Sequence, residues 1–283
     1  MEDLVIDLHL HINSKKMTKP FVWEWMDGFR KGNLIDEVLN EEEEQEPAKL
    51  VGLLKKSGVD YGICLAEYSP LVVGIVPNEY VSEFCRNYPS LIPFANINPY
   101  LSTKPDEDLK YCLDELGMKG LKMLPSYQHF YPHERRLYPL YELAQKRGII
   151  VMSHTGSSIF PGTKIRYADP IYWDDVARDF PELKIVLVHC GRGFWYDKAV
   201  FLAQLHPHVY VEIAGLPPKN LLKYIPNLEK IAHKVIFGSD WPGVPSIKGN
   251  IEAILNLPIS EQSKRNILGL NAASLLGIGG KLP

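Results

Sequence analysis

The amino-acid sequence predicts an α/β fold in which eight parallel strands close into a barrel. Strand-like and helix-like segments alternate along the chain, and the strand-like segments are almost continuously apolar, as strands buried on both faces are. Side chains able to bind a metal follow several of these strands at the same end. These observations favour a (β/α)8 TIM barrel, and 283 residues suit one such domain spanning residues 1–283.

Eight segments carry the strand pattern, and helical periodicity separates them. The predicted strands are Leu4–His11, Tyr61–Glu67, Ile92–Ile97, Gly120–Leu124, Ile149–His154, Lys184–His189, His208–Ile213 and Lys234–Ser239. The predicted helices are Pro47–Lys56, Glu79–Tyr88, Pro105–Glu115, Leu137–Arg147, Tyr172–Phe180, Tyr196–Leu205, Lys219–Ala232 and Ile247–Leu255. An open doubly wound sheet is the alternative fold. It is less favoured because a His-x-His motif, and not a glycine-rich phosphate loop, ends the first strand.

Two segments extend the minimal barrel. The first βα-loop carries a long insertion, Ile12–Glu46, where about two to six residues are usual. Its aromatic stretch Pro20–Met26 is interpreted either as a lid over a site at the strand ends or as packing on the rim or in a subunit interface. At the other end of the chain, Glu261–Leu276 predicts a C-terminal helix that packs against the barrel.

Five metal-capable side chains stand at the ends of predicted strands. His9 and His11 alternate along one strand, so both imidazoles face the same side and can share one cation. His154, His189 and Asp240 follow three other strands, each just before a turn signal. A lone histidine after an apolar strand is more often a hydrogen-bonded core residue. Together, however, these residues indicate a metal site at the C-terminal ends of the strands.

Composition and charge exclude several functional classes. A formal net charge of −3 gives no reason to expect a nucleic acid or an anionic membrane as partner, so a small molecule is the expected ligand. No apolar run approaches the roughly 20 residues that span a bilayer. The N-terminal residues lack a signal-peptide pattern, and the four cysteines form no C-x-x-C pair. We therefore expect a reduced, cytoplasmic protein.

Six motifs follow one another in a characteristic order along nearly the whole chain. They are Asp7–His11, Lys119–Pro125, Ser153–Gly156, Phe180–Gly191, Gly238–Pro242 and Ile267–Ala273. In this order and spacing they resemble the amidohydrolase superfamily, in the branch that includes aminocarboxymuconate-semialdehyde decarboxylase and predicted metal-dependent hydrolases.

The resemblance implies roles for the five metal-capable residues. His9, His11, His154 and Asp240 would bind a first divalent metal, with zinc expected. His189 would orient the attacking water or polarise the substrate, and Asp240 would also transfer a proton. A divalent cation can lower the pKa of its bound water to about 7, and a nearby carboxylate can accept the proton.

Lys122 decides how many metals the resemblance implies. In binuclear members of the superfamily a carboxylated lysine at the end of the fourth strand bridges two metals, and Lys122 lies on the fourth predicted strand. A free Lys122 ammonium would instead bind a substrate carboxylate. One metal is favoured, and two are expected if Lys122 is carboxylated.

Four further residues near strand ends are candidate substrate contacts, namely Glu67, Tyr127, Arg192 and Trp241. A guanidinium group pairs well with a carboxylate, so Arg192 is interpreted as an anion clamp or, alternatively, as half of a surface salt bridge.

Three functions are compatible with these residues. The leading hypothesis is a metal-dependent hydrolase that acts on a small amide, ester or lactone through a metal-activated water. The alternative is a metal-dependent decarboxylase, a lyase that acts without an oxidant on a small aromatic or unsaturated carboxylic acid. A non-catalytic metal-binding protein is disfavoured because every expected ligand position is filled. A homodimer or larger homo-oligomer agrees with the resemblance, and the aromatic insertion would suit an interface.

Overall fold

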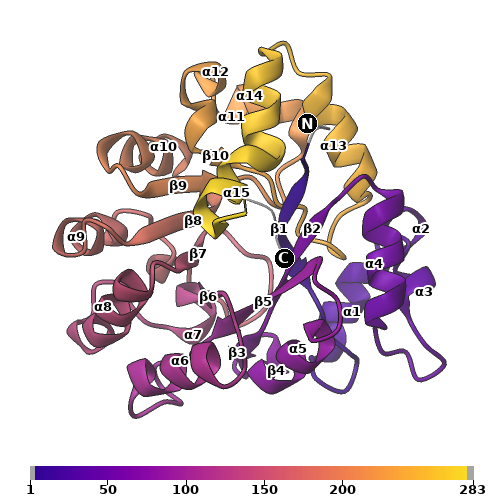
Figure 1. Cartoon of the computed structure of the whole chain (residues 1–283), viewed down its shortest axis with the longest axis horizontal. Helices are drawn as coiled ribbons and strands as arrows, with labels where there is room; N and C mark the ends of the chain where they lie inside the picture. Colours follow the sequence, from indigo (N-terminus) through magenta and orange to yellow (C-terminus); the bar gives the residue numbers. More distant parts are fainter. Residues whose placement is uncertain (1–3, 279–283) are drawn as a thin grey trace.

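A computed structural model describes residues 4–278 and contains an eight-stranded parallel barrel surrounded by helices (Figure 1). The barrel strands are β1 (Ile6–His11), β2 (Tyr61–Leu65), β5 (Leu91–Asn96), β6 (Gly120–Met123), β7 (Ile150–Gly156), β8 (Lys184–Arg192), β9 (Val209–Glu212) and β10 (Val235–Ile236). Each strand pairs in parallel with the next along the chain. The predicted (β/α)8 barrel is therefore confirmed, with small changes in the strand ends.

The ring closes between its last and first strands through the backbone that follows β10. The N–H of Leu8 donates to the carbonyl of Phe237 at 3.1 Å, and the N–H of His11 donates to that of Trp241 at 2.9 Å. Between these bonds the N–H of Asp240 donates to the carbonyl of His9 at 3.1 Å. Regular strand geometry ends at Ile236, earlier than predicted. The backbone beyond Ile236 still pairs with β1 through these three hydrogen bonds, which place Asp240 at the end of β1.

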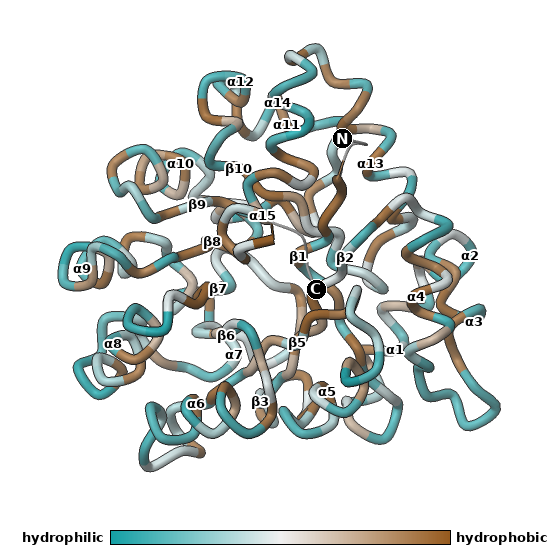
Figure 2. Tube along the Cα trace, in the orientation of Figure 1, coloured by the Kyte–Doolittle hydropathy of each residue, from teal (hydrophilic) through white to brown (hydrophobic). Residues whose placement is uncertain are grey.

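Helices cover the outside of the barrel with their apolar faces turned inward, as the hydropathy colouring shows (Figure 2). The outer helices are α4 (Pro47–Lys56), α5 (Asn78–Cys85), α6 (Pro105–Asp114), α8 (Tyr138–Arg147), α9 (Tyr172–Asp179), α10 (Tyr196–Leu205) and α13 (Ile247–Leu255). The short α7 (Pro125–Gln128) follows β6, and single 3-10 turns lie at Arg135–Leu137, Ile165–Tyr167, Pro218–Asn220 and Ala232–Lys234.

One helix that was predicted to be continuous is interrupted in the structure. The segment Lys219–Ala232 is broken into α11 (Leu221–Tyr224) and α12 (Leu228–Ile231). Pro226 has no N–H to donate, and its ring forces the preceding residue out of helical geometry, so Ile225 adopts φ −131° and ψ 79°.

Apolar side chains fill the barrel interior from the N-terminal ends of the strands. Ile63, Phe94 and Met152 are among the buried residues of this layer. Phe94 fits because Gly120 on β6 has no side chain, and a Cβ there would lie 2.3 Å from the Phe94 ring. The apolar layer leaves the C-terminal ends of the strands as the place for polar groups inside the barrel.

The C-terminal segment closes the same apolar end of the barrel. It forms α14 (Glu261–Arg265), a π-helical turn (Asn266–Leu270) and α15 (Asn271–Leu276), which confirms the predicted tail helix. Ala272, Ala273 and Leu275 of α15 pack against the interior layer.

The long insertion forms three short helices beside the C-terminal ends of the strands. These are α1 (Pro20–Asp27), α2 (Arg30–Asn33) and α3 (Ile35–Val38). The Lys19 N–H donates to the Val73 carbonyl at 2.8 Å, in a hairpin of β3 (Glu67–Ser69) and β4 (Gly74–Val76) that the periodicity did not predict. The insertion is thus held against the rim of the barrel.

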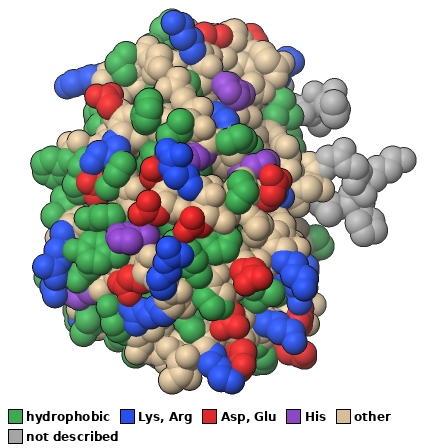
Figure 3. Space-filling view, turned by 90° about the vertical axis from the view of Figure 1, so that its left-hand side faces the viewer, with side chains coloured by type: hydrophobic (Ala, Val, Ile, Leu, Met, Phe, Trp, Pro, Cys, Tyr) green, Lys and Arg blue, Asp and Glu red, His purple; other side chains and the backbone are tan. Residues whose placement is uncertain are grey.

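The surface carries charges of both signs. On the flank formed by α8, α9 and α10, acidic and basic side chains are interspersed with hydrophobic ones (Figure 3). Within residues 4–278, no helix is long and apolar enough to cross a membrane.

The close packing of Phe94 on Gly120 leads to a test of the interior layer. We expect Gly120→Ala to lower the free energy of unfolding by about 1–3 kcal/mol, because the added methyl group overpacks a filled core. Gly52→Ala on α4 is the matched control: nothing lies within 4 Å of the added Cβ, and alanine should stabilise the helix by up to about 1 kcal/mol. Denaturant unfolding measures both, and equal stability of the two variants would contradict this packing.

Candidate metal centre

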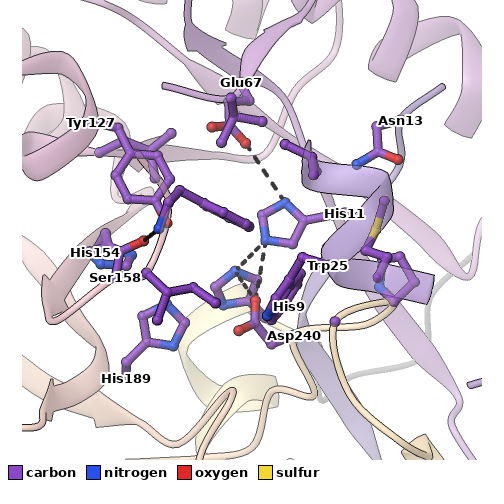
Figure 4. A pocket seen from close by; sticks show the side chains of 18 of the residues that line it. His9, His11, Asn13, Trp25, Glu67, Tyr127, His154, Ser158, His189 and Asp240 are labelled. Carbon is purple, nitrogen blue, oxygen red and sulfur yellow. Dashed lines mark hydrogen bonds and ion pairs between the residues drawn. The ribbon is translucent and has the colours of Figure 1, made fainter. Parts of the chain in front are cut away.

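Three ligand atoms converge where β1 meets the segment that follows β10. His9 Nε2 lies 3.2 Å from His11 Nε2, and Asp240 Oδ1 lies 3.4 Å from the first and 3.3 Å from the second. Figure 4 shows both imidazoles pointing toward this carboxylate. The alternation along β1 and the closing backbone bonds bring these residues together, as the predicted site requires.

Buried hydrogen bonds fix which nitrogen of each imidazole is free. His9 Nδ1 lies 3.0 Å from Glu212 Oε1, and because a carboxylate only accepts, this nitrogen carries the proton. His189 Nδ1 donates to the carbonyl of Ala214 at 2.7 Å. In both rings the Nε2 lone pair is therefore left for the cavity, which is the tautomer that a metal ligand needs.

Glu212 supports two elements of the site at once. Its second oxygen, Oε2, accepts the backbone N–H of His189 at 3.2 Å, and its side chain is fully buried. Gly238 makes room for it, since a Cβ there would lie 2.0 Å from Glu212 Oε1 and 2.9 Å from His9 Cβ. Glu212 was not among the predicted site residues. The available signal was an acidic residue that ends the apolar strand Val209–Glu212, facing the same end as the histidines.

His154 lines the same cavity from β7. Its ring centroid lies 4.7 Å from that of His189 and 5.0 Å from that of Tyr127. Its Nε2 is buried and has no hydrogen-bond partner within the described chain. A buried nitrogen of this kind costs free energy unless another group binds it, so it is a natural further ligand even though His154 lies outside the group formed by His9, His11 and Asp240, whose ligand atoms are within 4.8 Å of one another.

Residues of the last part of β8 adopt an unusual backbone conformation. His189 and Cys190 have φ of 61° and 50°, in the left-handed region that L-residues rarely occupy. The turn directs His189 into the cavity although its neighbour Val188 already packs in the interior layer. Such conformations cost on the order of 1–3 kcal/mol each and cluster at functional sites.

Burial sets the protonation states of these groups. It lowers the pKa of His154 and of His189 well below the usual value, and the pKa of His9 is lowered by burial and by the nearby Lys122 ammonium. Burial alone would raise the pKa of Asp240, but His9, His189 and His11 outweigh this effect and hold it well below its usual range. Neutral imidazoles and an ionised carboxylate are the forms that bind a cation.

Lys122 and Glu67 flank the three converging ligands. Lys122 is buried, its Nζ lies 3.3 Å from His9 Nε2, and burial lowers its pKa to about 8. Glu67 Oε2 lies 3.9 Å from His11 Nδ1, and its other oxygen accepts the hydroxyl of Ser69. Burial raises the pKa of Glu67. Both predicted residues therefore stand next to the candidate ligands.

Arg192 faces Asp240 from the end of β8. Its Nη1 lies 3.8 Å from Asp240 Oδ2, while Nε and Nη2 donate to the carbonyl of Ser157 at 3.3 and 3.0 Å. Both members of this ion pair line the cavity.

These groups surround a cavity of about 310 Å³. The insertion supplies part of its wall through Val22, Trp25 and Met26, and Phe160 packs edge-on to Trp25 at 5.2 Å between ring centroids. Tyr127 lines the cavity with its hydroxyl 2.8 Å from Ser158 Oγ. The aromatic insertion thus forms part of the cavity wall.

Trp241 is the one candidate substrate contact that lies elsewhere. It is fully buried and its indole N–H donates to the carbonyl of Asn33 at 2.7 Å. Trp241 does not line the cavity, although its neighbour Asp240 does. It fastens the insertion to the barrel.

The donor set fits a divalent metal ion. Imidazole nitrogen and carboxylate oxygen are preferred ligands of zinc and related cations. A second group of possible ligands, His9, His189 and Glu212, shares His9 with the first, and both oxygens of Glu212 already accept hydrogen bonds. One cation is therefore the better fit.

Comparison with known proteins extends these observations. Residues 6–278 match the family model described as amidohydrolase, and no curated protein sequence matches the chain significantly. A TIM-barrel protein of Bordetella bronchiseptica is similar in structure, with a TM-score of 0.79 and 24% identity over 98% of this chain and 99% of that one. Under 25% identity, such similarity establishes the fold alone.

The chain is also similar in structure to two enzymes of different reaction classes. A 2,6-dihydroxybenzoate decarboxylase from Rhizobium has a TM-score of 0.71 and 16% identity, over 98% of this chain and 99% of that one. A probable 2-pyrone-4,6-dicarboxylic acid hydrolase from Acinetobacter baumannii, with citric acid bound, has a TM-score of 0.66 and 15% identity, over 96% of this chain and 99% of that one. Other similar structures include a decarboxylase with bound manganese and a hydratase.

The hydrogen bonds that Glu212 accepts from His9 and from the His189 backbone lead to a test of the site. Glu212→Gln keeps the size but offers one acceptor oxygen to two donors, so one buried N–H would face an amide NH2. We expect metal affinity to fall by about 10- to 100-fold, as measured by competition with a chelator. The exposed Glu83→Gln is the matched control and should bind like the wild type. Unchanged affinity in E212Q would contradict the role of Glu212.

Proposed function

The chain belongs to the amidohydrolase family, and on this premise we propose that it is a metal-dependent hydrolase of a small amide, ester or lactone. The convergence of His9 Nε2, His11 Nε2 and Asp240 Oδ1 at the C-terminal mouth of the barrel carries the proposal. Active sites of this fold lie at that face.

The proposed cofactor is one divalent cation, zinc or manganese. His9, His11 and Asp240 would hold it, with His154 as a further ligand. When bound, such an ion polarises a carbonyl group and lowers the pKa of water to about 7.

The residues around these ligands would supply the remaining chemistry. Water attacks the carbonyl carbon and gives a proton to Asp240, which is ionised at neutral pH. The bond from the carbonyl carbon to the leaving oxygen or nitrogen then breaks, and the leaving group takes that proton. His189, which is neutral with Nε2 free, orients the attacking water by accepting a hydrogen bond.

Substrate selection would rest on charge and shape. Lys122 and Arg192 are two cations at the cavity wall and suit a carboxylate on the substrate. Trp25, Tyr127 and Phe160 provide aromatic walls that suit a flat, unsaturated group and exclude water.

Decarboxylation is the second candidate function, and the same two cations favour it. A cavity that binds a carboxylate between Lys122 and Arg192 beside aromatic walls also suits a small aromatic or unsaturated acid. In that reaction the bond from the ring or alkene carbon to the carboxylate breaks, carbon dioxide leaves, and a proton is delivered to the carbon.

The number of metals per chain tests the proposed cofactor. We expect one equivalent of zinc or manganese in the reconstituted wild type, because a second ion would compete with the hydrogen bonds of Glu212. Lys122→Ala should also retain one equivalent. Elemental analysis with an independent protein determination measures both. Two equivalents in the wild type that fall to one in K122A would instead identify Lys122 as a bridging ligand, and none would contradict the metal centre.

Turnover tests the reaction itself. We expect the reconstituted protein to hydrolyse members of a panel of lactones, esters and amides that carry a carboxylate. His189→Asn should lower kcat by a factor on the order of 10² to 10⁴ and leave the bound metal in place, because His189 is proposed to act on water. The control is His206→Asn, which changes a histidine bound to Asp174 outside the cavity.

The same panel includes carboxylated phenols, which separates the two candidate functions. Release of carbon dioxide from these compounds without hydrolysis of the others would contradict hydrolysis and support decarboxylation. Equal kcat in H189N and the wild type would contradict the role of His189.

A further inference from the structure

A second cavity adjoins the metal-site cavity on the other side of Trp25. It has a volume of about 530 Å³. Most of its wall is apolar and comes from α13, from the insertion between α1 and α2 and from the loops after β9 and β10, namely Phe29, Leu216, Pro217, Val244, Pro245 and Ala253.

The two cavities share one wall. Trp25, Arg192, Asp240 and Gly243 line both of them. Trp25 lies directly on Gly243, where a Cβ would be 2.2 Å from the indole ring, so only glycine admits the indole in this position. Trp25 is therefore the partition between the cavities.

Asp240 presents one oxygen toward each side of this wall. Oδ1 lies with His9 and His11, whereas Oδ2 faces Arg192 at 3.8 Å. Gly215 leaves the space that the second oxygen occupies, because a Cβ there would lie 2.6 Å from Oδ2 and 2.5 Å from Arg192 Nη1. A group that leaves the reacting carbonyl on this side would meet the same carboxylate that holds the proton.

We propose that the second cavity is the subsite for an apolar leaving group of the substrate, an alkyl or aryl alcohol or amine. This inference rests on the proposed hydrolysis. The acyl part lies in the metal-site cavity and the leaving group extends past Trp25. When the bond from the carbonyl carbon to oxygen or nitrogen breaks, the leaving atom takes the proton from Asp240, and the product alcohol or amine remains in the second cavity.

The composition of the wall selects this occupant. Among the described residues that line this cavity, Asp240 is the one metal-capable side chain, so a second metal is not expected there. The apolar walls gain free energy by covering alkyl or aryl surface, at a rate that corresponds to about three- to fourfold in affinity for each added CH2 group.

Binding of the product alcohols alone tests the subsite without any need for turnover. The protein is labelled with fluorotryptophan, and the Trp25 resonance is assigned by Trp25→Phe. Fluorine NMR then follows titrations with 1-alkanols from ethanol to hexanol and with benzyl alcohol. We expect the Trp25 resonance to move while that of the fully buried Trp173 does not. The dissociation constant should fall about three- to fourfold for each CH2 group.

Two variants on α13 locate the binding site. Ala253→Phe fills the second cavity and should weaken benzyl alcohol binding by roughly tenfold or more. Leu255→Phe adds the same ring on the exposed side of the helix and should bind like the wild type. A stationary Trp25 resonance, or equal affinity of A253F and the wild type, overturns the proposal. Failure of the hydrolase panel leaves these titrations intact, so the two proposals are tested separately.

Discussion

The hydrogen bonds of one buried carboxylate organise the whole candidate site. Glu212 accepts the Nδ1–H of His9 through one oxygen and the backbone N–H of His189 through the other, so it connects three strands of the barrel. The bond to His9 leaves the Nε2 lone pair of that ring toward Asp240. An ionised group in such surroundings is costly unless every acceptor position is used. Burial accordingly raises the pKa of Glu212 to about 7.

The apolar layer below the site makes the arrangement rigid. Phe94 fills the interior over Gly120, and α15 closes the opposite end, so the polar groups at the strand ends lie next to a closely packed apolar layer. Two glycines, Gly238 and Gly215, then remove side chains where Glu212 and Asp240 must sit. The same fold thereby supplies both the electrostatics of the site and the space in which its groups meet.

Much of the barrel could be predicted from the sequence because each strand and helix is encoded by local periodicity. The residues that line the cavity could be predicted for the same reason, since His9, His11, His154, His189 and Asp240 all follow apolar strands. Glu212 and Trp241 could not be placed in this way. Their roles depend on contacts with His9 and Asn33, more than 200 residues distant in the chain. The break at Pro226 is encoded locally, but apolar periodicity alone does not reveal it.

The closure of the ring between the first and last strands has a consequence for how the protein folds. His9 and His11 lie near the start of the chain, while Asp240 and the backbone that seals the barrel come some 230 residues later. Contacts between residues so far apart in the chain form slowly, because the entropy cost of closing a long loop comes before any stabilising contact is made. A nascent chain still short of Asp240 holds the two histidines without their carboxylate partner. The candidate metal centre therefore cannot be complete in a nascent chain that has not yet reached Asp240.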